Sequence, residues 1–378
     1  MSDYFSSNKA VHTYKALHHG ALNYGIIGSG AIGLYLAQVL EESEAPLKVS
    51  MFGRSDAKTH ELIVKERLEQ KDFEQKQYEQ NTSSKQQTKA LAKRGHYHLK
   101  HHNLQSVIEN KDPQIRLSDL DLLIIPVKYY QLAALVAQLQ GKLPEQLPLL
   151  LLQNGLGGHE ILHEKFPNNT LYVGTTSDAV FKQGHANKST ITINARGKLS
   201  IGAVELANAE PESKAPAVIQ ALIDAHRHAA KPRDSKVPPS SAVWAQDIRT
   251  HLYQKLAANA VINPLSAKLN CRNGEIKGAA ELLEGIKSEI FKLYKALEVG
   301  LDEHLLNRYI DDVIHNTAQN YSSMQQDIYH KRKTEIDGIL GVLIEKAAKL
   351  NMSLPLIERI YQQIKDMESQ YLGTDSAE

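Results

Sequence analysis

Apolar residues follow two different patterns along the chain. Short apolar runs recur in the first part, at 24–27, 47–52 and 122–127, with an amphipathic helix predicted at 31–40. Such runs are typical of parallel strands that helices cover on both faces. From Ala242 onward, apolar residues recur with helical spacing nearly to the end. We therefore predict an α/β first domain followed by an all-α second domain.

Two extended segments and a connector complete this division. Residues 170–186 and 189–204 are rich in β-branched and aromatic residues, which predicts an antiparallel extension or cover of the sheet. Residues 212–228 predict a helix, and the proline- and serine-rich stretch KPRDSKVPPSS predicts the connector between domains. The expected parts are a polar arm at 1–20, a sheet-containing domain at 21–238 and a helical domain at 239–378.

A polar insertion occupies about 56–118. ELIVKERLEQKDFEQKQYEQ predicts a solvent-exposed helix, and NTSSKQQTK predicts a loop because it has too few apolar residues to pack. HYHLKHH then brings together His96, His98, His101 and His102. Metal binding is one interpretation, but no Cys or carboxylate stands at ligand spacing. We favour an exposed basic strand and predict no metal site.

The first apolar run ends in GSGAIG, and the predicted helix follows at once. In such a loop Gly28 permits the tight turn, Gly30 lets backbone N–H groups approach a pyrophosphate, and Gly33 lets helix and strand pack closely. The N-terminus of the helix adds partial positive charge for the phosphates. The motif alone is weak, but its place between strand and helix predicts a dinucleotide site. Its residues are Gly28, Ser29, Gly30, Ala31, Ile32 and Gly33.

The end of the second apolar run indicates which dinucleotide binds. An NAD site usually carries Asp or Glu there, for the ribose 2′-hydroxyl, whereas this chain has Arg54 and Ser55. A guanidinium binds a 2′-phosphate with two parallel hydrogen bonds. We predict NADP(H), with Arg54 at the 2′-phosphate; an ordinary exposed arginine is the alternative.

Two polar residues follow later strands of the predicted sheet. Lys128 comes directly after the run at 122–127, and Asn154 follows the apolar stretch of LPLLLLQNGLGG. Open α/β sheets bind ligands at the carboxyl ends of their strands. Lys128 is therefore expected at this ligand-binding edge. Asn154 is expected at the same edge, toward the nicotinamide, although it could equally be a turn residue before glycine.

HLYQKLAANAVINPLSAKLNCRNGEI carries the strongest side-chain pattern. Lys255, Asn259 and Asn263 recur at i, i+4 and i+8, so a helix would place them in one row. Apolar residues around the row predict a buried helix, and Pro264 is expected to end or kink it. The row is either a recognition surface or a stripe that pairs with a neighbouring element.

NYSSMQQDIYHKRKTEIDGILGVL is the other candidate stretch. Asn320 and Ser323 are expected on one helix face, with Asp327 on the same side. A second helix is expected to start at Thr334, because Asp337 stands at capping-box spacing. Glu335 would then lie in its first turn, where a carboxylate can simply favour the helix dipole.

Composition narrows the function classes. Lys and Arg number 44 against 43 Asp and Glu, so net charge predicts neither nucleic-acid nor membrane binding. The single cysteine, Cys271, argues against a disulfide framework and fits a reducing compartment. The chain has no apolar signal core at its start, and a cytoplasmic protein is expected.

Together these segments resemble the ketopantoate reductase family along most of the chain. The matching motifs are GSGAIG, the arginine of FGRS, PVK, LLQNGLG, YQKLAANAVINPLSAKLNCRNGE, NYSSMQQDI and TEIDGILG. The resemblance implies an N-terminal Rossmann domain that binds NADP(H) and an all-α C-terminal domain. It also implies NADPH-dependent reduction of 2-dehydropantoate to (R)-pantoate, on the route to pantothenate and coenzyme A.

The resemblance also assigns roles to individual residues. Lys255 takes the position of the general acid and Glu335 that of the substrate-binding carboxylate, with both counted as catalytic. Lys128 and Asn154 fall between nicotinamide and substrate. The positions that match substrate contacts are Asn259, Asn263, Asn273, Asn320 and Ser323.

Two other functions stay open. A reductase of another small 2-keto acid would share the fold and cofactor, and an NADPH-sensing regulatory protein would bind the cofactor without turnover. The intact Lys, Asn, Ser and Glu set favours ketopantoate. The N-terminal arm and the insertion lie outside the resemblance and leave the oligomeric state open, with a homodimer as one outcome.

Overall fold

The computed structural model describes residues 20–67, 91–185, 187–203, 214–229 and 241–373. The chain divides into two compact units. The sheet unit contains the described residues up to Val127, together with Leu139–Leu152 and Phe166–Gln246. The helical unit contains Lys128–Gln138, Gln153–Lys165 and the described residues from Asp247 onward. The predicted polar arm and most of the predicted connector lie outside the described residues, so the domain boundaries stay a prediction.

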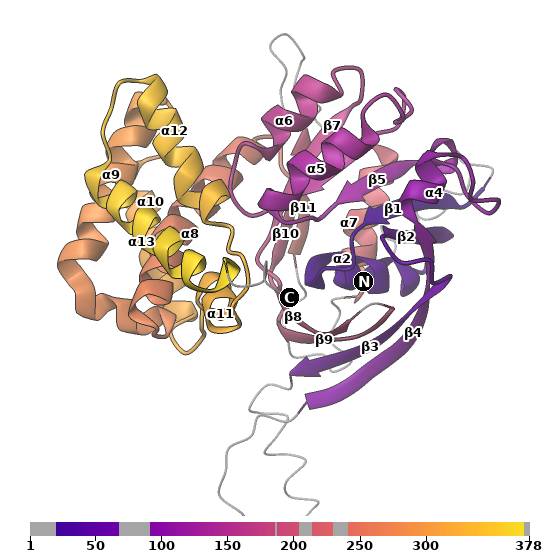
Figure 1. Ribbon diagram of the computed structural model, residues 1–378, viewed down its shortest axis with the longest axis horizontal. Helices are drawn as coiled ribbons and strands as arrows, with labels where there is room; N and C mark the ends of the chain where they lie inside the picture. The colour runs from indigo at the N-terminus through magenta and orange to yellow at the C-terminus, as the bar shows by residue number, and fades with distance from the viewer. Residues whose placement is uncertain (1–19, 68–90, 186, 204–213, 230–240, 374–378) are drawn as a thin grey trace, which may run out of the picture. The chain divides into compact units, whose positions relative to one another are not determined.

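One mixed sheet organises the sheet unit. Eleven strands of the described residues pair in the order β11-β10-β7-β6-β5-β1-β2-β4-β3-β9-β8 (Figure 1). Their bounds are β1 Leu22–Ile27, β2 Leu47–Gly53, β3 Thr59–Arg67, β4 Leu91–Asn103, β5 Leu122–Ile125, β6 Leu149–Leu152, β7 Leu171–Thr176, β8 Ala179–His185, β9 Lys188–Ala195, β10 Lys198–Ala203 and β11 Ser241–Trp244.

The middle of this sheet is parallel. Strand β1 pairs in parallel with β2 and β5, and β5 and β6 continue the parallel order to β7. Strands β5 and β6, LLII and LLLL, are buried at every position, as expected where both faces of a strand are covered. Helices α2 (Ala31–Glu41) and α7 (Ala217–Ala229) pack side by side on this sheet (Figure 1). The predicted α/β class is confirmed.

The two extended segments each form two strands. Strand β7 joins the parallel core and β10 pairs with it antiparallel, with Ile201 opposite Gly174. Strands β8 and β9 form an antiparallel hairpin at the other end of the sheet, where β9 pairs with β3. The prediction of an antiparallel extension is therefore confirmed.

The insertion contains strands where a helix was expected. Residues 59–67 form β3, whose Leu62 and Val64 are buried, so the helix predicted from ELIVKER is wrong. The alternating apolar positions follow strand periodicity, and antiparallel pairing with β4 satisfies the backbone. The predicted loop NTSSKQQTK lies outside the described residues.

The histidine-rich stretch forms the end of β4, as a strand was expected there. His96 and His98 are exposed, but His101 and His102 are buried, which corrects the prediction of a wholly exposed strand. The His101 Nδ1 donates to the Ala57 carbonyl at 3.0 Å. The His102 Nδ1 lies 3.0 Å from an Asp112 carboxylate oxygen. Both rings therefore serve packing within the sheet unit.

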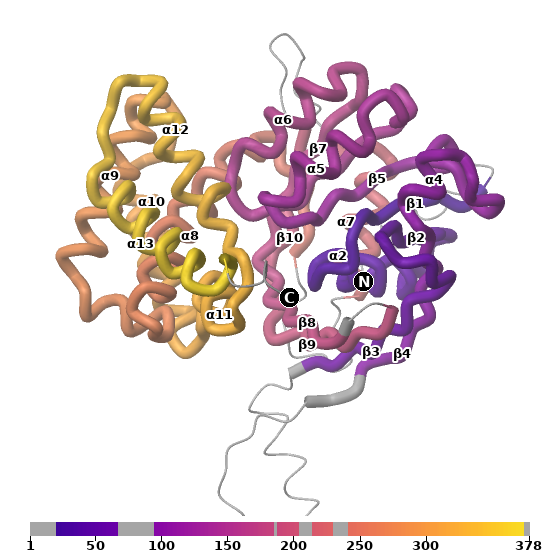
Figure 2. The backbone as a smooth tube through the Cα atoms, viewed as in Figure 1, coloured from indigo at the N-terminus to yellow at the C-terminus, as the bar shows by residue number. Residues whose placement is uncertain are grey.

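The helical unit is built around one long helix, α8 (Ile248–Leu269), which α9, α10, α11 and α13 contact (Figure 2). The other helices are α5 (Tyr129–Leu139), α6 (Gly158–Lys165), α9 (Ala280–Ala296), α10 (Glu303–Asn316), α11 (Ser323–Tyr329), α12 (Val342–Lys349) and α13 (Pro355–Leu372). A 3₁₀ segment spans Asn273–Ala279 and a π-helical turn spans Asp337–Gly341. The predicted all-α character of the second half is confirmed.

Helix α8 continues through Pro264 to Leu269, so this proline does not end the helix. The other expectation, that Pro264 kinks the helix, stays a prediction. A proline inside a helix costs about 3 kcal/mol. Pro264 and its neighbours Leu265 and Ser266 are buried, and burial among the surrounding helices offsets that cost. The helix ends instead at Asn270, which adopts the left-handed conformation at φ 49°.

Across the described residues, no helix combines the length and apolar character that a bilayer crossing requires.

Candidate active site

Glu335 is the centre of a polar network in the helical unit. The carboxylate is 5% exposed, and its Oε2 accepts from Lys128 Nζ at 2.7 Å and from Asn154 Nδ2 at 3.1 Å. Its Oε1 accepts from the backbone N–H of Tyr129 at 3.3 Å. Three donors on a nearly buried carboxylate fix its position.

Asn154 connects this carboxylate to Lys255. The Lys255 ammonium donates to Asn154 Oδ1 at 3.0 Å, while the Nδ2 of the same amide donates to Glu335. An amide can accept on one side and donate on the other, which also fixes its orientation. Lys128, Glu335, Asn154 and Lys255 therefore form one connected chain of hydrogen bonds, with an ammonium at each end. All four were predicted site residues.

The charges around Lys128 are balanced within the helical unit. Burial opposes its protonation, but the carboxylates of Glu335 and then Asp327 outweigh burial and raise the pKa of Lys128. Burial raises the pKa of Asp327, while the positive charges of Lys128 and Arg332 act in the opposite direction. Arg332 pairs with Asp327 at 3.1 Å. Lys128 therefore stays a cation beside two acidic groups.

A close backbone contact supports the network. Gly155 has φ +90°, and a Cβ added to it would lie 2.0 Å from the Gly338 carbonyl oxygen. The next N–H, of Leu156, donates to this same carbonyl at 3.2 Å. Gly338 in turn lies against the ring of Tyr129, where an added Cβ would meet Cγ at 2.6 Å. The two glycines let the loop with Asn154 reach the segment with Glu335.

The backbone at Glu335 differs from the predicted capped helix. Glu335 lies in a bend before the π-helical turn, and the Thr334 hydroxyl accepts from Ile336, two residues on. Asp337 accepts from Tyr361 at 2.7 Å instead of capping. The predicted capping box is therefore wrong, because the Asp337 side chain that would complete it bonds to Tyr361 instead. A π-turn often marks a functional site.

The polar row on α8 lies on a single helix, as predicted. Asn259 is half-buried and Asn263 is 7% exposed. Across the described residues, neither side-chain amide has a hydrogen-bond partner in the protein. No atom of either amide is among the buried side-chain atoms without a partner, so both can also reach solvent or a ligand. Their substrate roles stay a prediction.

The remaining predicted substrate residues, all within the described part of the chain, make no hydrogen bond to the network around Glu335. Asn273 is buried and donates to Thr317 at 3.0 Å, while its Oδ1 has no partner among the described residues. Helix α11 begins at Ser323, so Asn320 precedes it and the shared helix face is wrong. Both Asn320 and Ser323 are exposed. Ser322 caps the helix in their place and is buried against Ser266 at 2.7 Å.

In the sheet unit, the glycine loop has the backbone that a dinucleotide needs. Gly28 has φ +100°, and a Cβ on Gly33 would lie 2.5 Å from the Gly28 carbonyl, so both positions require glycine. A Cβ on Gly30 would meet nothing within 4 Å. Gly30 is also the N-cap of α2 and makes no side-chain cap bond. The loop therefore leaves open space and uncapped N–H groups, which suit a phosphate.

Arg54 follows the last residue of β2 and is exposed. Its carbonyl accepts from Asn103 Nδ2 at 3.2 Å, and that amide also donates to Asp56 at 2.8 Å. Asn103 therefore holds the turn after β2. No carboxylate of the described residues pairs with the Arg54 guanidinium, which leaves it available to an anion.

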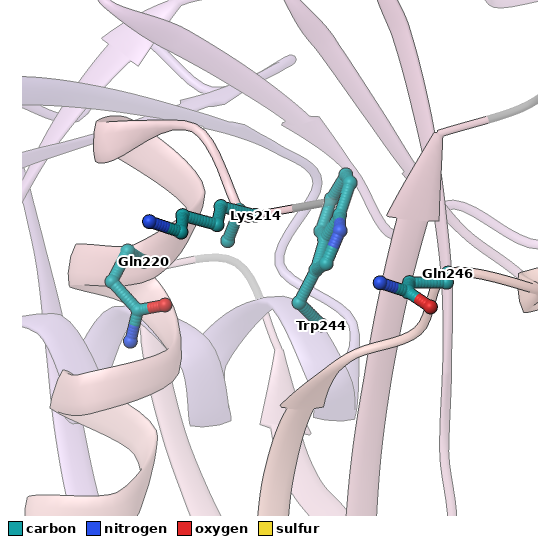
Figure 3. Close-up of a pocket in the computed structure, with 5 residues that line it drawn as sticks. Lys214, Gln220, Trp244 and Gln246 are labelled. Atoms are coloured by element: carbon teal, nitrogen blue, oxygen red, sulfur yellow. The ribbon is translucent and has the colours of Figure 1, made fainter. Parts of the chain in front are cut away.

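One further cavity lies in the sheet unit. Its volume is about 600 Å³. Figure 3 shows four of its lining residues, Lys214, Gln220, Trp244 and Gln246. None of the predicted site residues lines this cavity.

Sequence reasoning missed several participants. The Tyr129 N–H donates to Glu335, but a backbone donor leaves no motif. Asp327 was expected beside Asn320 and Ser323, but its effect on the pKa of Lys128 was not predicted. Lys182 donates to the Ser29 carbonyl at 2.7 Å and was not singled out either. It lies 153 positions from Ser29, so only the pairing of β8 with the rest of the sheet brings it to the glycine loop.

Comparisons with known proteins match both halves of the chain. The family model described as ketopantoate reductase PanE/ApbA matches residues 24–205, and the model for the C-terminal part of that family matches residues 247–368. A 2-dehydropantoate 2-reductase of Yersinia pestis is 33% identical over 264 residues, which cover 70% of this chain and 79% of the relative.

Solved structures share the fold at lower identity. A ternary complex of D-mandelate dehydrogenase with NADH and anilino(oxo)acetate aligns with TM-score 0.70 at 19% identity, covering 93% of this chain and all of that one. A dimeric ketopantoate reductase from Staphylococcus aureus aligns with TM-score 0.61 at 19% identity, with 93% and 100% coverage. At such identities these structures support the fold alone.

Proposed function

The chain belongs to the ketopantoate reductase family, and we propose that it catalyses the NADPH-dependent reduction of 2-dehydropantoate to (R)-pantoate. This reaction lies on the route to pantothenate and coenzyme A. The observation that carries the proposal is the network of Lys255, Asn154, Glu335 and Lys128 in one compact unit.

Lys255 is the proton donor in this proposal. Reduction of a keto carbon leaves negative charge on its oxygen, so a cation that can also give a proton must stand within hydrogen-bond reach. Asn154 accepts one Lys255 N–H, and in this proposal the substrate oxygen is a further acceptor of the same ammonium. The amide therefore orients the cation without neutralising it.

Glu335 binds and orients in this proposal. The carboxylate holds Asn154 in the orientation that serves Lys255, and it can accept from a substrate hydroxyl. Lys128 pairs with Glu335 at 2.7 Å. The unpartnered amides of Asn259 and Asn263 bind substrate oxygens without adding charge. Asn273, Asn320 and Ser323 complete the proposed substrate contacts through the resemblance alone.

The residues of the sheet unit fit a dinucleotide. The open space at Gly30 and the uncapped start of α2 suit a pyrophosphate, and Arg54 suits a 2′-phosphate. The bound nicotinamide supplies the hydride. We propose NADP(H) as the cofactor, held in the sheet unit by residues 28–33 and Arg54.

A second candidate is NADH-dependent reduction of another 2-keto acid. D-Mandelate dehydrogenase, which shares the fold, was solved with NADH. Asp56, two residues after Arg54, is a carboxylate of the kind that an NAD site carries. A third candidate, an NADPH sensor without turnover, does not need the ammonium at Lys255.

One spectrophotometric assay tests these candidates. The purified chain is mixed with NADPH or NADH and with ketopantoate or a branched 2-keto acid, and coenzyme oxidation is followed. We expect the highest kcat/KM with NADPH and ketopantoate. A preference for NADH would contradict the role of Arg54, and binding of NADPH without oxidation of it would favour the sensor.

The proposed setting is cytoplasmic, with a small 2-keto acid as the substrate and a homodimer as the assembly. Sedimentation of the purified chain tests the assembly directly.

A further inference from the structure

Lys182 brings a positive charge to the glycine loop. It lies on β8, and its ammonium donates to the carbonyl of Ser29, in the middle of GSG, at 2.7 Å. Both residues belong to the sheet unit, and α2 contacts β8 as well as β9. The lysine is therefore attached to the loop that would hold the phosphates.

The charge of Lys182 has no counterion among the described residues. Burial lowers the pKa of this half-buried ammonium, and no acidic group raises it. Its titratable neighbour is His60, whose pKa is lowered to about 4 by burial, by Lys182 and by His101. His60 is therefore neutral near pH 7 and adds no second positive charge beside the lysine.

Lys188, on the other strand of the same hairpin, shows the usual arrangement of a surface lysine, which is exposed and paired with a carboxylate. Its ammonium is exposed and pairs with Glu61 at 3.0 Å. Lys182, by contrast, is half-buried and bonds a neutral carbonyl. A partly desolvated cation is stabilised by a nearby anion, so the difference between the two lysines indicates that a ligand provides it.

The donors at this loop point to a phosphate. An ammonium has three N–H donors, and the Ser29 carbonyl uses one. The first turn of α2 adds backbone N–H groups without a side-chain cap, next to the open space at Gly30. The pyrophosphate of a dinucleotide carries one negative charge on each phosphate, and its oxygens accept several such bonds at once.

We infer that Lys182 is a phosphate-binding residue of the cofactor site, which contacts the pyrophosphate common to NADPH and NADH. The inference rests on the proposed function. It assigns different parts of the coenzyme to two cations, with Arg54 at the 2′-phosphate and Lys182 at the pyrophosphate.

Coenzyme binding to the full-length protein separates these assignments. Dissociation constants of NADPH and NADH are measured by titration calorimetry for the wild type, Lys182→Met, Lys182→Arg, Arg54→Ala and the control Lys188→Met. We expect Lys182→Met to raise the dissociation constants of NADPH and NADH by the same factor. The increase should be roughly 10- to 100-fold, as for a lost hydrogen bond to a charged group. Lys182→Arg should retain most of the affinity for both coenzymes. Arg54→Ala should lower the affinity for NADPH alone, and Lys188→Met should leave the affinity for both coenzymes unchanged.

The salt dependence of binding distinguishes a phosphate contact from a structural tether of the loop. Losing a phosphate contact should make the NADPH dissociation constant of Lys182→Met less sensitive to salt, because one screened charge pair is gone. An unchanged salt dependence, or unchanged affinity with lower thermal stability, would show a tether and overturn the inference. If Lys182→Met lowers the affinity for NADPH alone, Lys182 contacts the 2′-phosphate instead, and the inference is also overturned.

The wild-type titration keeps the two proposals apart. If the wild type binds neither coenzyme, the proposed function fails and the inference about Lys182 fails with it. If the wild type binds NADPH and Lys182→Met binds it equally well, only the inference fails.

Discussion

The sheet unit and the helical unit prepare their candidate sites in different ways. The glycine loop is made mostly of backbone, with positions where a side chain is excluded, such as Gly33, or simply absent, such as Gly30. The helical unit builds its network from long side chains around a nearly buried carboxylate, Glu335. A backbone site recognises what all dinucleotides share, whereas a side-chain network recognises a particular substrate. Variants in the glycine loop should therefore change coenzyme binding, whereas variants in the network should change kcat or KM for the substrate.

The largest effect is expected at Lys255. Lys255→Ala removes the proposed proton donor and should lower kcat by roughly 10² to 10⁴. Coenzyme affinity should stay within a few-fold, because the glycine loop is unchanged. Steady-state kinetics with ketopantoate measure kcat, and Lys268→Ala, on the last turn of the same helix, is the matched control. Full activity of Lys255→Ala would end the proposed mechanism.

Gly155→Ala tests the backbone contact under the network. The φ of +90° and the clash with the Gly338 carbonyl should lower the free energy of unfolding by about 3 kcal/mol. Urea unfolding measures the change. Gly278→Ala is the control, since an added Cβ there meets nothing within 4 Å. Equal stability of the two variants would show that the loop can move away from Gly338.

His60 makes the sheet unit sensitive to acid. Burial, with the charges of Lys182 and His101, lowers its pKa from 6.5 to about 4, and both ring nitrogens lack partners among the described residues. Between these two values the unfolded chain binds the proton and the folded chain does not, so stability falls as the pH falls.

His60→Leu should remove this part of the pH dependence. From pH 7 to 4.5 we expect the variant to lose about 2 to 3 kcal/mol less stability than the wild type. Urea unfolding at both pH values gives the comparison, which cancels the contribution of carboxylates common to both proteins. Parallel stability curves would contradict the buried neutral histidine.

Glu335→Ala should act mainly on substrate binding. Loss of the carboxylate releases Asn154 and Lys128, and KM for ketopantoate should rise about tenfold, as for one lost charged hydrogen bond. Glu345→Ala provides the control, because that side chain is 61% exposed and pairs with Lys349 on the surface. A fall in kcat with constant KM would instead make Glu335 part of proton transfer.

Gly30→Ala is expected to act only on the binding of the cofactor. The methyl group meets no protein atom within 4 Å, so the unfolding midpoint should not change. It would occupy the space proposed for the pyrophosphate and weaken NADPH binding by about tenfold, equivalent to 1.4 kcal/mol. A large loss of stability would show that this glycine serves the fold.

Local sequence patterns were enough to predict much of the fold and part of the candidate site. The buried strands, the glycine loop and helix α8 each follow from residues that are close in sequence. The bonds of Glu335 to Lys128 and Asn154 span 207 and 181 positions, so spacing could not predict them, and only the family resemblance grouped these residues. The failures at Pro264 and at the capping box of Thr334 have the same origin. In both, tertiary packing outweighs a local preference.

The division of the chain limits how this protein can be dissected. Helices α5 and α6 come from the first half of the sequence but belong to the helical unit, together with Lys128 and Asn154. A fragment starting at residue 239 would therefore carry Glu335 and Lys255 without the groups that hold them, and would present a nearly buried carboxylate to solvent. Separate expression of the two sequence halves would yield no complete catalytic unit.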